Sequence, residues 1–505
     1  MRKYLIIPLF FVGLLSSYAQ TKKAFVKAGD KAFKNKNYYS ALSYYGEALE
    51  FDEDNPQFLY KYAEAARMYQ ALEIAGAYYQ SVLDSEKASE FPLAKYWMAI
   101  VEKQRGDYGA ARQLLEEYLA GGGSGNQLYA QKAKTAIEDC TWAQAELEKP
   151  HKLSIDQLNK RVNSAYSEFG PYLSGDTLYY SSYRFENRND EHQPPRRLTK
   201  VLTSVRGSKG KPLRRGFNEK EKLTAHTTFS LDGKRIYYTI CQYVGEVDIR
   251  CQIYYREKGK RKRWGKAKKL PATINAPGFT ATHPNIGRNP ENGKEVLYFV
   301  SDRPEGQGKL DLWYAPLEAK GKLGKPVNLE GINSEENDIT PFYHLASNSL
   351  FFSSEGYRGM GGYDIFLTNW EGSDWSAVRH TGTPLNSSYN DVYYFLNADS
   401  TQAYLSSNRL GAFYLEKDNK VCCNDIYKVK IHPQDPVEEL PEEPLDSLLV
   451  DVDIPAIEPQ LDPLPSEPDP LPIPNETTPP VPTKLEDFLP LALYFDNDEP
   501  DKRTR

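Results

Sequence analysis

Two histidines, His226 and His283, are the residues of this sequence whose type and placement come nearest to a site for chemistry. They occupy equivalent positions in a long internal repeat, each beside an expected inner strand. An imidazole nitrogen is a common zinc ligand, but a zinc site takes three or four ligands, and no third ligand recurs with this pair. The pattern therefore favours a role in the framework of the repeat over a metal pair, and no metal site is predicted.

The sequence lacks the motifs of the common catalytic sites. It contains no Gly-x-Ser-x-Gly elbow, no His-Glu-x-x-His helix, no Walker loop and no dinucleotide-binding fingerprint. Ser124 stands in the run GGGSGN, which reads as a flexible loop between helices and not as a strand-to-helix turn. We therefore predict no catalytic residue, no cofactor and a protein that is not an enzyme.

Charged residues recur at fixed places in the same long repeat. An arginine follows an aromatic strand at Arg184, Arg303 and Arg409, with Arg358 displaced. A ligand site needs different groups from different repeats, whereas like charges in several repeats are typical of hydrogen bonds and ion pairs within a framework. The structural role is therefore favoured over a functional one. The same interpretation covers the aspartates that open a later strand, which are Asp311, Asp364 and Asp425.

A secretory signal peptide is predicted at residues 1–20. Arg2 and Lys3 precede an apolar run that ends at Leu15, and small residues follow up to Ala19. The run is about twelve residues long, which is short of the roughly 20 needed to span a bilayer, so cleavage is favoured over a membrane anchor. The protein is expected to be exported, with no membrane-spanning segment.

Export permits disulfide bonds. The chain has five cysteines, an odd number, and their spacing is not that of a metal site. Cys241 and Cys251 flank an expected hairpin and face each other if it forms. They are the candidate disulfide.

Residues 21–148 repeat with a period of about 34 residues, and small and aromatic residues recur at fixed offsets. Small residues allow paired antiparallel helices to pack closely, while aromatic side chains fill the space between them. The pattern resembles the tetratricopeptide repeat, which implies an all-α solenoid with the segment from Leu128 to Leu147 as a capping helix. The recurring positions in the first and third copies are Gly29, Tyr38, Ala41, Tyr45, Ala48, Ala99, Tyr108, Ala111, Leu115 and Tyr118.

In such a solenoid the first helix of each pair lines a concave groove. Aromatic and charged residues mixed on one concave face suit a peptide or a partner helix, although part of this stripe must be ordinary helix packing. The predicted partner-binding residues are Asp30, Phe33, Tyr60, Glu64, Arg67, Tyr96, Ile100 and Lys103.

Residues 151–432 repeat with a longer period. Each copy has an inner strand, a turn and an aromatic strand such as KRIYYTICQ or EVLYFVSDR. Four short strands per ~55 residues predict an all-β propeller, and five copies predict five blades, with the strand near KLSIDQL completing the last blade. The segments SLDGKRIYY and SSEGYRGMGGYDIF resemble the TolB-type propeller family. An asparagine marks each copy, at Asn163, Asn218, Asn275, Asn333 and Asn386.

A dense basic loop, REKGKRKRWGKAKK, lies in the second copy. A solvated hairpin is the ordinary interpretation, and a docking patch for an acidic partner or membrane phosphate groups is the functional one. Nucleic acid is not expected as a partner, because the protein is exported and the net charge of the chain is −6. The centre of the patch is Lys260, Arg261, Lys262 and Arg263.

The chain continues into an acidic Pro-rich linker at 433–484. Between residues 433 and 482 it has fifteen prolines, thirteen acidic residues and no lysine or arginine. This composition predicts a disordered, extended spacer, because it cannot bury a core. In residues 485–505, the sequence LYFDNDEPD reads as a strand that meets a turn.

The order of these segments resembles that of periplasmic OmpA-family proteins, of the PorE type tied to type IX secretion and gliding. The resemblance implies that 485–505 is the first strand of a truncated OmpA-like domain, which in the family holds peptidoglycan. It implies a non-enzymatic scaffold in the periplasm, associated with the outer membrane, whose partners are envelope proteins. Peptidoglycan becomes a partner only if a complete OmpA-like domain follows.

The alternative is a propeller-based ligand sensor or hydrolase. Propellers bind small molecules at the mouth of the central channel, on loops between strands. Dissimilar polar groups that converge from three or more blades at one channel mouth would favour this alternative, whereas repeated framework residues closing the channel would not.

Overall fold

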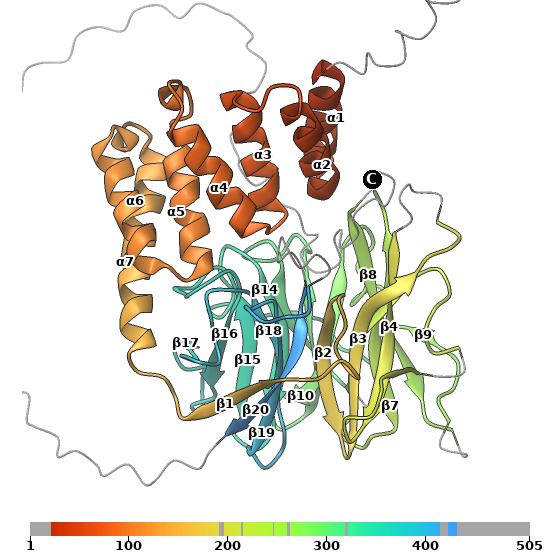
Figure 1. Ribbon diagram of the computed structural model, residues 1–505. Coiled ribbons are helices and arrows are strands. Elements are labelled where there is room, and N and C mark those ends of the chain that lie inside the picture. The colour runs from red at the N-terminus through yellow and green to blue at the C-terminus, as the bar shows by residue number, and fades with distance from the viewer. Residues whose placement is uncertain are drawn as a thin grey trace, which may run out of the picture. The chain divides into compact units, whose positions relative to one another are not determined.

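The computed structural model describes residues 22–431, apart from 191–195, 214–215, 246, 260–262, 319–321 and 415–422. The described chain forms seven α-helices followed by a five-bladed β-propeller (Figure 1). None of the described helices is both long and apolar enough to cross a membrane. The predicted signal peptide, the acidic linker and the OmpA-like strand lie outside the described residues.

The helices come in consecutive pairs, and α7 packs against α6. Their bounds are α1 (Lys22–Lys34), α2 (Tyr38–Leu49), α3 (Pro56–Met68), α4 (Leu72–Leu83), α5 (Ala94–Arg105), α6 (Tyr108–Ala120) and α7 (Gln127–Leu147).

Short polar residues start several of these helices. The Asn55 side chain accepts hydrogen bonds from the backbone N–H groups of Gln57 and Phe58, and Pro56 occupies the first helical position. Small residues then allow close packing: a Cβ on Gly29 would lie 2.4 Å from the Tyr45 ring. The small positions that the repeat predicted therefore lie where helices meet.

The propeller consists of five four-stranded antiparallel sheets. In the first two blades the strands are β2 (Glu168–Ser174), β3 (Thr177–Glu186), β4 (Arg197–Val205), β5 (Lys211–Pro212), β6 (Leu223–Phe229), β7 (Arg235–Tyr243), β8 (Ile249–Glu257) and β9 (Lys268–Lys269). In the third and fourth they are β10 (Ala281–Arg288), β11 (Glu295–Ser301), β12 (Asp311–Pro316), β13 (Val327–Asn328), β14 (Asp338–His344), β15 (Ser349–Ser354), β16 (Asp364–Asn369) and β17 (Arg379–His380).

The fifth blade joins the two ends of the propeller. It contains β18 (Asp391–Leu396), β19 (Gln402–Ser407), β20 (Asp425–Ile431) and, as its outermost strand, β1 (Leu153–Gln157). β1 pairs antiparallel with β20, from Leu153 opposite Ile431 to Gln157 opposite Tyr427. The prediction of five blades closed by the strand near KLSIDQL is confirmed.

The recurring asparagine links neighbouring blades. Asn275 accepts a hydrogen bond from the Ile253 N–H at 2.7 Å and donates to the carbonyl oxygens of Ile253 and Leu270 at 3.0 Å. Asn275 precedes the third blade, and Ile253 lies in the third strand of the second blade. Each of the other four asparagines likewise accepts from the N–H and donates to the carbonyl oxygen of a single residue. For Asn163, Asn218, Asn333 and Asn386 that residue is Ile426, Val201, Leu312 and Ile365 respectively.

The recurring arginines serve the same framework. Arg303 donates to the carbonyl oxygens of Thr273 and Ile274, and Arg409 donates to those of Pro384 and Leu385. In the fourth blade a tyrosine takes this place, with the Tyr357 hydroxyl 2.6 Å from the Ile332 carbonyl oxygen. Arg358 instead lies 3.3 Å from Glu138 and 3.4 Å from Asp139 of α7.

The recurring aspartates order the loops before the third strands. Asp364 accepts hydrogen bonds from the backbone N–H groups of Met360 and Gly361 at 2.7 and 3.1 Å. Asp311 and Asp425 accept backbone N–H groups of their own loops. The structural role predicted for these charged residues is confirmed.

Cys241 of β7 and Cys251 of β8 are opposite each other in register and form a disulfide, with a Cα–Cα distance of 4.0 Å. The bond therefore joins the second and third strands of one blade. Cys140 is a free thiol buried in the helical region.

Candidate functional site

The innermost strand of every blade has a bulge at the same place. The bulge residues share a left-handed backbone, with φ between 47° and 62°, and the register of each inner strand shifts there. A bulge redirects a side chain, and a left-handed backbone is costly for residues other than glycine. The five residues are Gly170, His226, His283, Thr340 and Tyr393.

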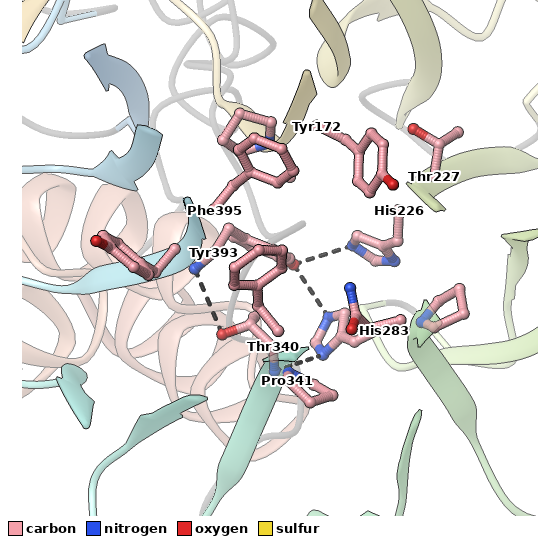
Figure 2. A pocket seen from close by; sticks show the side chains of 14 residues that line it. Tyr172, His226, Thr227, His283, Thr340, Pro341, Tyr393 and Phe395 are labelled. Carbon is pink, nitrogen blue, oxygen red and sulfur yellow. Dashed lines mark hydrogen bonds between the residues drawn. The ribbon is translucent and has the colours of Figure 1, made fainter. Parts of the chain in front are cut away.

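Three of these side chains meet in the central channel (Figure 2). The Tyr393 hydroxyl lies 2.9 Å from Nε2 of His226 and 3.0 Å from Nε2 of His283. The two imidazole rings are 4.4 Å apart, centroid to centroid. The residues come from the second, third and fifth blades, so the ring closure of the propeller is what brings them together.

The hydrogen bonds fix the tautomer of each histidine. The Thr340 backbone N–H, 3.4 Å away, can only donate, so Nδ1 of His283 accepts and its Nε2 carries the proton. His283 therefore donates to the Tyr393 oxygen, and the Tyr393 hydroxyl donates to Nε2 of His226. The remaining proton of His226 is on Nδ1, which lies 3.3 Å from the hydroxyls of Thr239 and Thr282.

This chain of hydrogen bonds carries no charge at neutral pH. Burial lowers the pKa of His283 to about 3. Burial, together with His283, lowers the pKa of His226 well below its usual value. Burial also raises the pKa of Tyr393 well above its usual value. Neutral groups that satisfy one another close the channel, and within the described residues no three His, Cys, Asp or Glu side chains gather as a metal site.

A larger cavity lies over this closed floor, at the ends of the blades where turns join the first and second strands. Its volume is about 460 Å³. We call it the channel cup, and its lining residues together come from all five blades. The aromatic walls are Tyr172, Phe342 and Phe395, and the polar groups are Asn285, His344 and Asn397. The outer rim is Leu231, Leu345, Ala398 and Asp399.

The cup continues into the channel through a narrow cavity of about 50 Å³ beside the histidines. Tyr172, Asn285, Phe342 and Phe395 line both cavities (Figure 2 labels Tyr172 and Phe395). The polar side chains at this mouth come from three blades: Asn285 from the third, His344 from the fourth, and Asn397 and Asp399 from the fifth. The mouth therefore meets the condition stated for the ligand-binding alternative, while the channel beneath it is closed by the cluster of His226, His283 and Tyr393.

One histidine joins two turns of the cup rim. Nε2 of His344 lies 3.1 Å from the Asn397 carbonyl oxygen, and its Nδ1 lies 2.8 Å from the Ser347 hydroxyl. Burial lowers the pKa of His344 below its usual value, so it is neutral at neutral pH. The lining contains one carboxylate, the exposed Asp399, and no lysine or arginine.

Several of the predicted partner-binding residues hold helices together. Arg67 pairs with Glu64 at 2.9 Å, and its guanidinium lies over the Trp97 ring at 3.7 Å. Tyr96 is buried and makes an edge-to-face contact with Tyr129 of α7, with the ring centroids 5.0 Å apart. Lys103 pairs with Asp139 of α7 at 3.0 Å.

The other predicted residues of the groove are more accessible. Asp30 is exposed and accepts a hydrogen bond from the Tyr45 hydroxyl at 2.8 Å. Phe33, Tyr60 and Ile100 are half-buried. The helical stripe therefore contains packing residues as well as accessible ones, as its mixed composition indicated.

The predicted basic patch is described only at its edge. Lys260, Arg261 and Lys262 lie outside the described residues, and Arg263 is exposed. The hairpin around them is closed by a bridge between Lys258 and Trp264.

Sequence reasoning found two members of the channel cluster and missed Tyr393 and Thr340. The signal was present, because aligning the inner strands TAHTTF, ATHPNI, DITPFY and DVYYFL places all four residues in one column. Repetition of one residue type is visible at His226 and His283, whereas Thr340 and Tyr393 differ in type from them and do not stand out as a repeat.

Comparison with known proteins gives structural matches only. No protein-family model and no curated protein matches the chain. An α-L-arabinofuranosidase from Lactobacillus brevis matches with 11% identity and a TM-score of 0.35, over 54% of this chain and 92% of its own. An endo-arabinase from Bacteroides thetaiotaomicron has 13% identity and a TM-score of 0.35, over 55% and 98%. An exo-β-1,3-galactanase from Clostridium thermocellum matches with 13% identity and a TM-score of 0.34, over 54% of this chain and 61% of its own. Likeness at this level concerns the fold alone.

These matches correct one prediction from the sequence. The missing catalytic motifs predicted a protein that is not an enzyme, whereas the three matching structures are all named as enzymes. The prediction is wrong because it excluded enzymes from an architecture that enzymes share, and the exclusion is dropped.

Proposed function

We propose that the channel cup binds an uncharged, hydroxylated ligand with a ring-shaped apolar face, such as a saccharide. The observation that carries this proposal is the convergence of aromatic side chains and of polar side chains from three blades on one cavity of about 460 Å³. Concave, largely apolar cavities with a few placed polar groups are typical ligand sites. The cup has the size of a site for one or two sugar rings.

The charge and the polar groups of the lining select the class of ligand. A lining without lysine or arginine, and with neutral His344, offers nothing to an anion. A single exposed carboxylate offers little to a cation. Asn285 and Asn397 supply amide groups, and the Tyr172, Phe342 and Phe395 rings supply flat apolar surface that suits the face of a sugar.

Blocking the cup is the direct test. We expect Ala398→Trp, an exposed position in the lining, to weaken binding of a neutral oligosaccharide at least tenfold, because the indole fills the mouth without removing a core contact. Calorimetry with neutral disaccharides and trisaccharides measures this. The matched control is Glu291→Trp, on an exposed turn outside the lining. No binding to wild type, or equal binding by both variants, contradicts the proposal.

A second candidate function is that the cup hydrolyses the saccharide it binds. Release of shorter sugars from the same disaccharides and trisaccharides tests it. Glycoside hydrolysis generally uses two carboxylates roughly 5–10 Å apart. The described lining provides Asp399, so any second carboxylate must come from elsewhere. Binding is therefore better supported than turnover, and loss of product release in Asp399→Asn is the result expected of a hydrolase.

We also propose a scaffold role for the helical region, which holds an envelope protein as partner. Paired helices joined to a five-bladed propeller support it, together with the resemblance to PorE-type proteins. In this proposal the protein is exported to the periplasm, and an OmpA-like domain tethers it to peptidoglycan beneath the outer membrane. Crosslinked envelope extracts should then yield a partner that depends on Asp30 and Tyr60. Recovery of no partner contradicts this role.

A further inference from the structure

A second cavity lies on the helical region, away from the predicted concave groove. It has a volume of about 570 Å³ and is formed by α2 with single residues of α3 and α4. We call it the acidic groove. Its aromatic and acidic lining residues are Tyr39, Tyr62, Tyr78, Glu47, Glu50 and Glu53.

Close helix packing shapes the aromatic wall. Tyr62 and Tyr78 meet edge to face at 4.5 Å between ring centroids. Gly46 allows Tyr62 to lie against α2, since a Cβ there would be 3.3 Å from the Tyr62 ring. All three tyrosines of the groove are half-buried, so each ring presents one accessible part to the cavity.

The charge of the groove is uncompensated. Glu50 and Glu53 are exposed and Glu47 is half-buried, and none of the three has an ion pair within the described chain. Glu47 stands in the last turn of α2 and Glu50 caps it, with no basic residue in that turn. Carboxylates at a helix C-terminus face the negative end of the dipole, so these charges do not stabilise α2.

We propose that the acidic groove binds an extended segment of a partner protein that presents lysine or arginine side chains. A cation bound there gains from the carboxylates and from the faces of tyrosine rings together. The alkyl stems of lysine and arginine pack against the same rings. A volume of about 570 Å³ is enough for two or three such side chains and not for a folded domain.

Two other segments of the same chain, the acidic linker and the basic hairpin, are poorer occupants. Residues 433–482 contain thirteen acidic residues and no lysine or arginine, so like charge excludes them. Two lysines at the base of the basic hairpin are engaged within it, with Lys258 over the Trp264 ring and Lys268 paired with Glu257 at 2.7 Å. A broad hairpin also enters a groove between helices less readily than an extended segment does.

Fluorescence anisotropy on the full chain tests the proposal, with a labelled decapeptide of alternating arginine and serine as the probe. At low salt we expect the triple variant E47Q/E50Q/E53Q to bind at least tenfold more weakly than wild type. The matched control E86Q/E148Q/E291Q makes the same change in net charge at exposed positions outside the groove, and it should bind within twofold of wild type. The same peptide with glutamate for arginine should not bind.

Other outcomes overturn the proposal. Equally weakened peptide binding in both triple variants would mean that only net charge attracts the peptide. No peptide binding by wild type would mean that the groove does not bind basic segments. Sedimentation velocity tests whether a second copy of this chain occupies the groove. Self-association that only E47Q/E50Q/E53Q abolishes would mean that the occupant is another molecule of this chain and not a partner protein. Thermal melting verifies that the groove variant folds, and removal of charge from the C-terminal end of α2 should not lower its melting temperature.

Discussion

Replacing Asn275 by alanine should lower the free energy of unfolding by about 3 kcal/mol, because three buried hydrogen bonds disappear at once. Asn275 is buried, and its amide joins the Ile253 N–H and the carbonyl oxygens of Ile253 and Leu270. Water cannot replace the lost partner at a buried site, so these backbone groups stay unsatisfied. Urea denaturation followed by tryptophan fluorescence measures the change.

An isosteric variant separates hydrogen bonding from volume. Asn275→Asp keeps the acceptor for Ile253 but turns a second oxygen toward two carbonyl oxygens, so it should be at least as destabilising as alanine at pH 7. Protonation of the aspartate at position 275 restores one hydrogen-bond donor. The difference in free energy of unfolding between wild type and this variant should therefore shrink as the pH falls. The exposed Asn292→Ala is the control and should cost less than about 1 kcal/mol. A small effect of both Asn275 variants would contradict the linking role.

The framework of the propeller was predictable because it repeats. Asn275 and its four equivalents make the same bonds in every blade, so their spacing in the sequence reports a constraint that every blade shares. The pairing of β1 with β20 followed from the same periodicity, since a ring of four-stranded blades needs one outer strand from the far end of the chain.

The channel cluster was only half predictable, because its members differ in type. His226 and His283 are alike and stood out, whereas Tyr393 shares only the backbone bulge with them. Tyr393 is 167 residues from His226 and 110 from His283, so only the closed ring makes them neighbours. The cup could not be predicted for the same reason, since turns from different blades form its lining.

The helical groove shows a different limit. Helical periodicity indicates which face a residue occupies, but it does not tell whether a neighbouring helix covers that face. Arg67 and Lys103 were predicted as partner-binding residues. Each contacts a neighbouring helix, since Arg67 lies over the Trp97 ring of α5 and Lys103 forms an ion pair with Asp139 of α7.

Acid should destabilise the protein through its buried channel histidines. Burial holds the pKa of His283 at about 3 in the folded chain, whereas an unfolded histidine has a pKa of about 6.5. Between these values the unfolded chain binds a proton that the folded chain does not, so stability falls as the pH falls from about 6.5 toward 3. The loss attributable to His283 between pH 7 and pH 4 should be about 3 kcal/mol.

Other buried groups act in the opposite direction and must be separated from this effect. Burial raises the pKa of Asp338 and of Asp425 to about 7, so below about pH 7 both are protonated in the folded protein and stabilise it. Their contribution falls as the pH rises from about 4 through 7. They are present in every variant of a histidine, so comparison between wild type and variant removes them.

The decisive measurement is therefore a difference. His283→Gln keeps an amide N–H that can donate to Tyr393, but it has no group that titrates between pH 7 and pH 4. The free energy of unfolding of this variant should fall less than that of wild type over this interval, by about 3 kcal/mol. The exposed His151→Gln leaves the channel cluster intact and should keep the acid-dependent loss of wild type. Parallel pH profiles for wild type and His283→Gln would mean that His283 accepts a proton in the folded protein, and the neutral hydrogen-bond chain through Tyr393 would then be wrong.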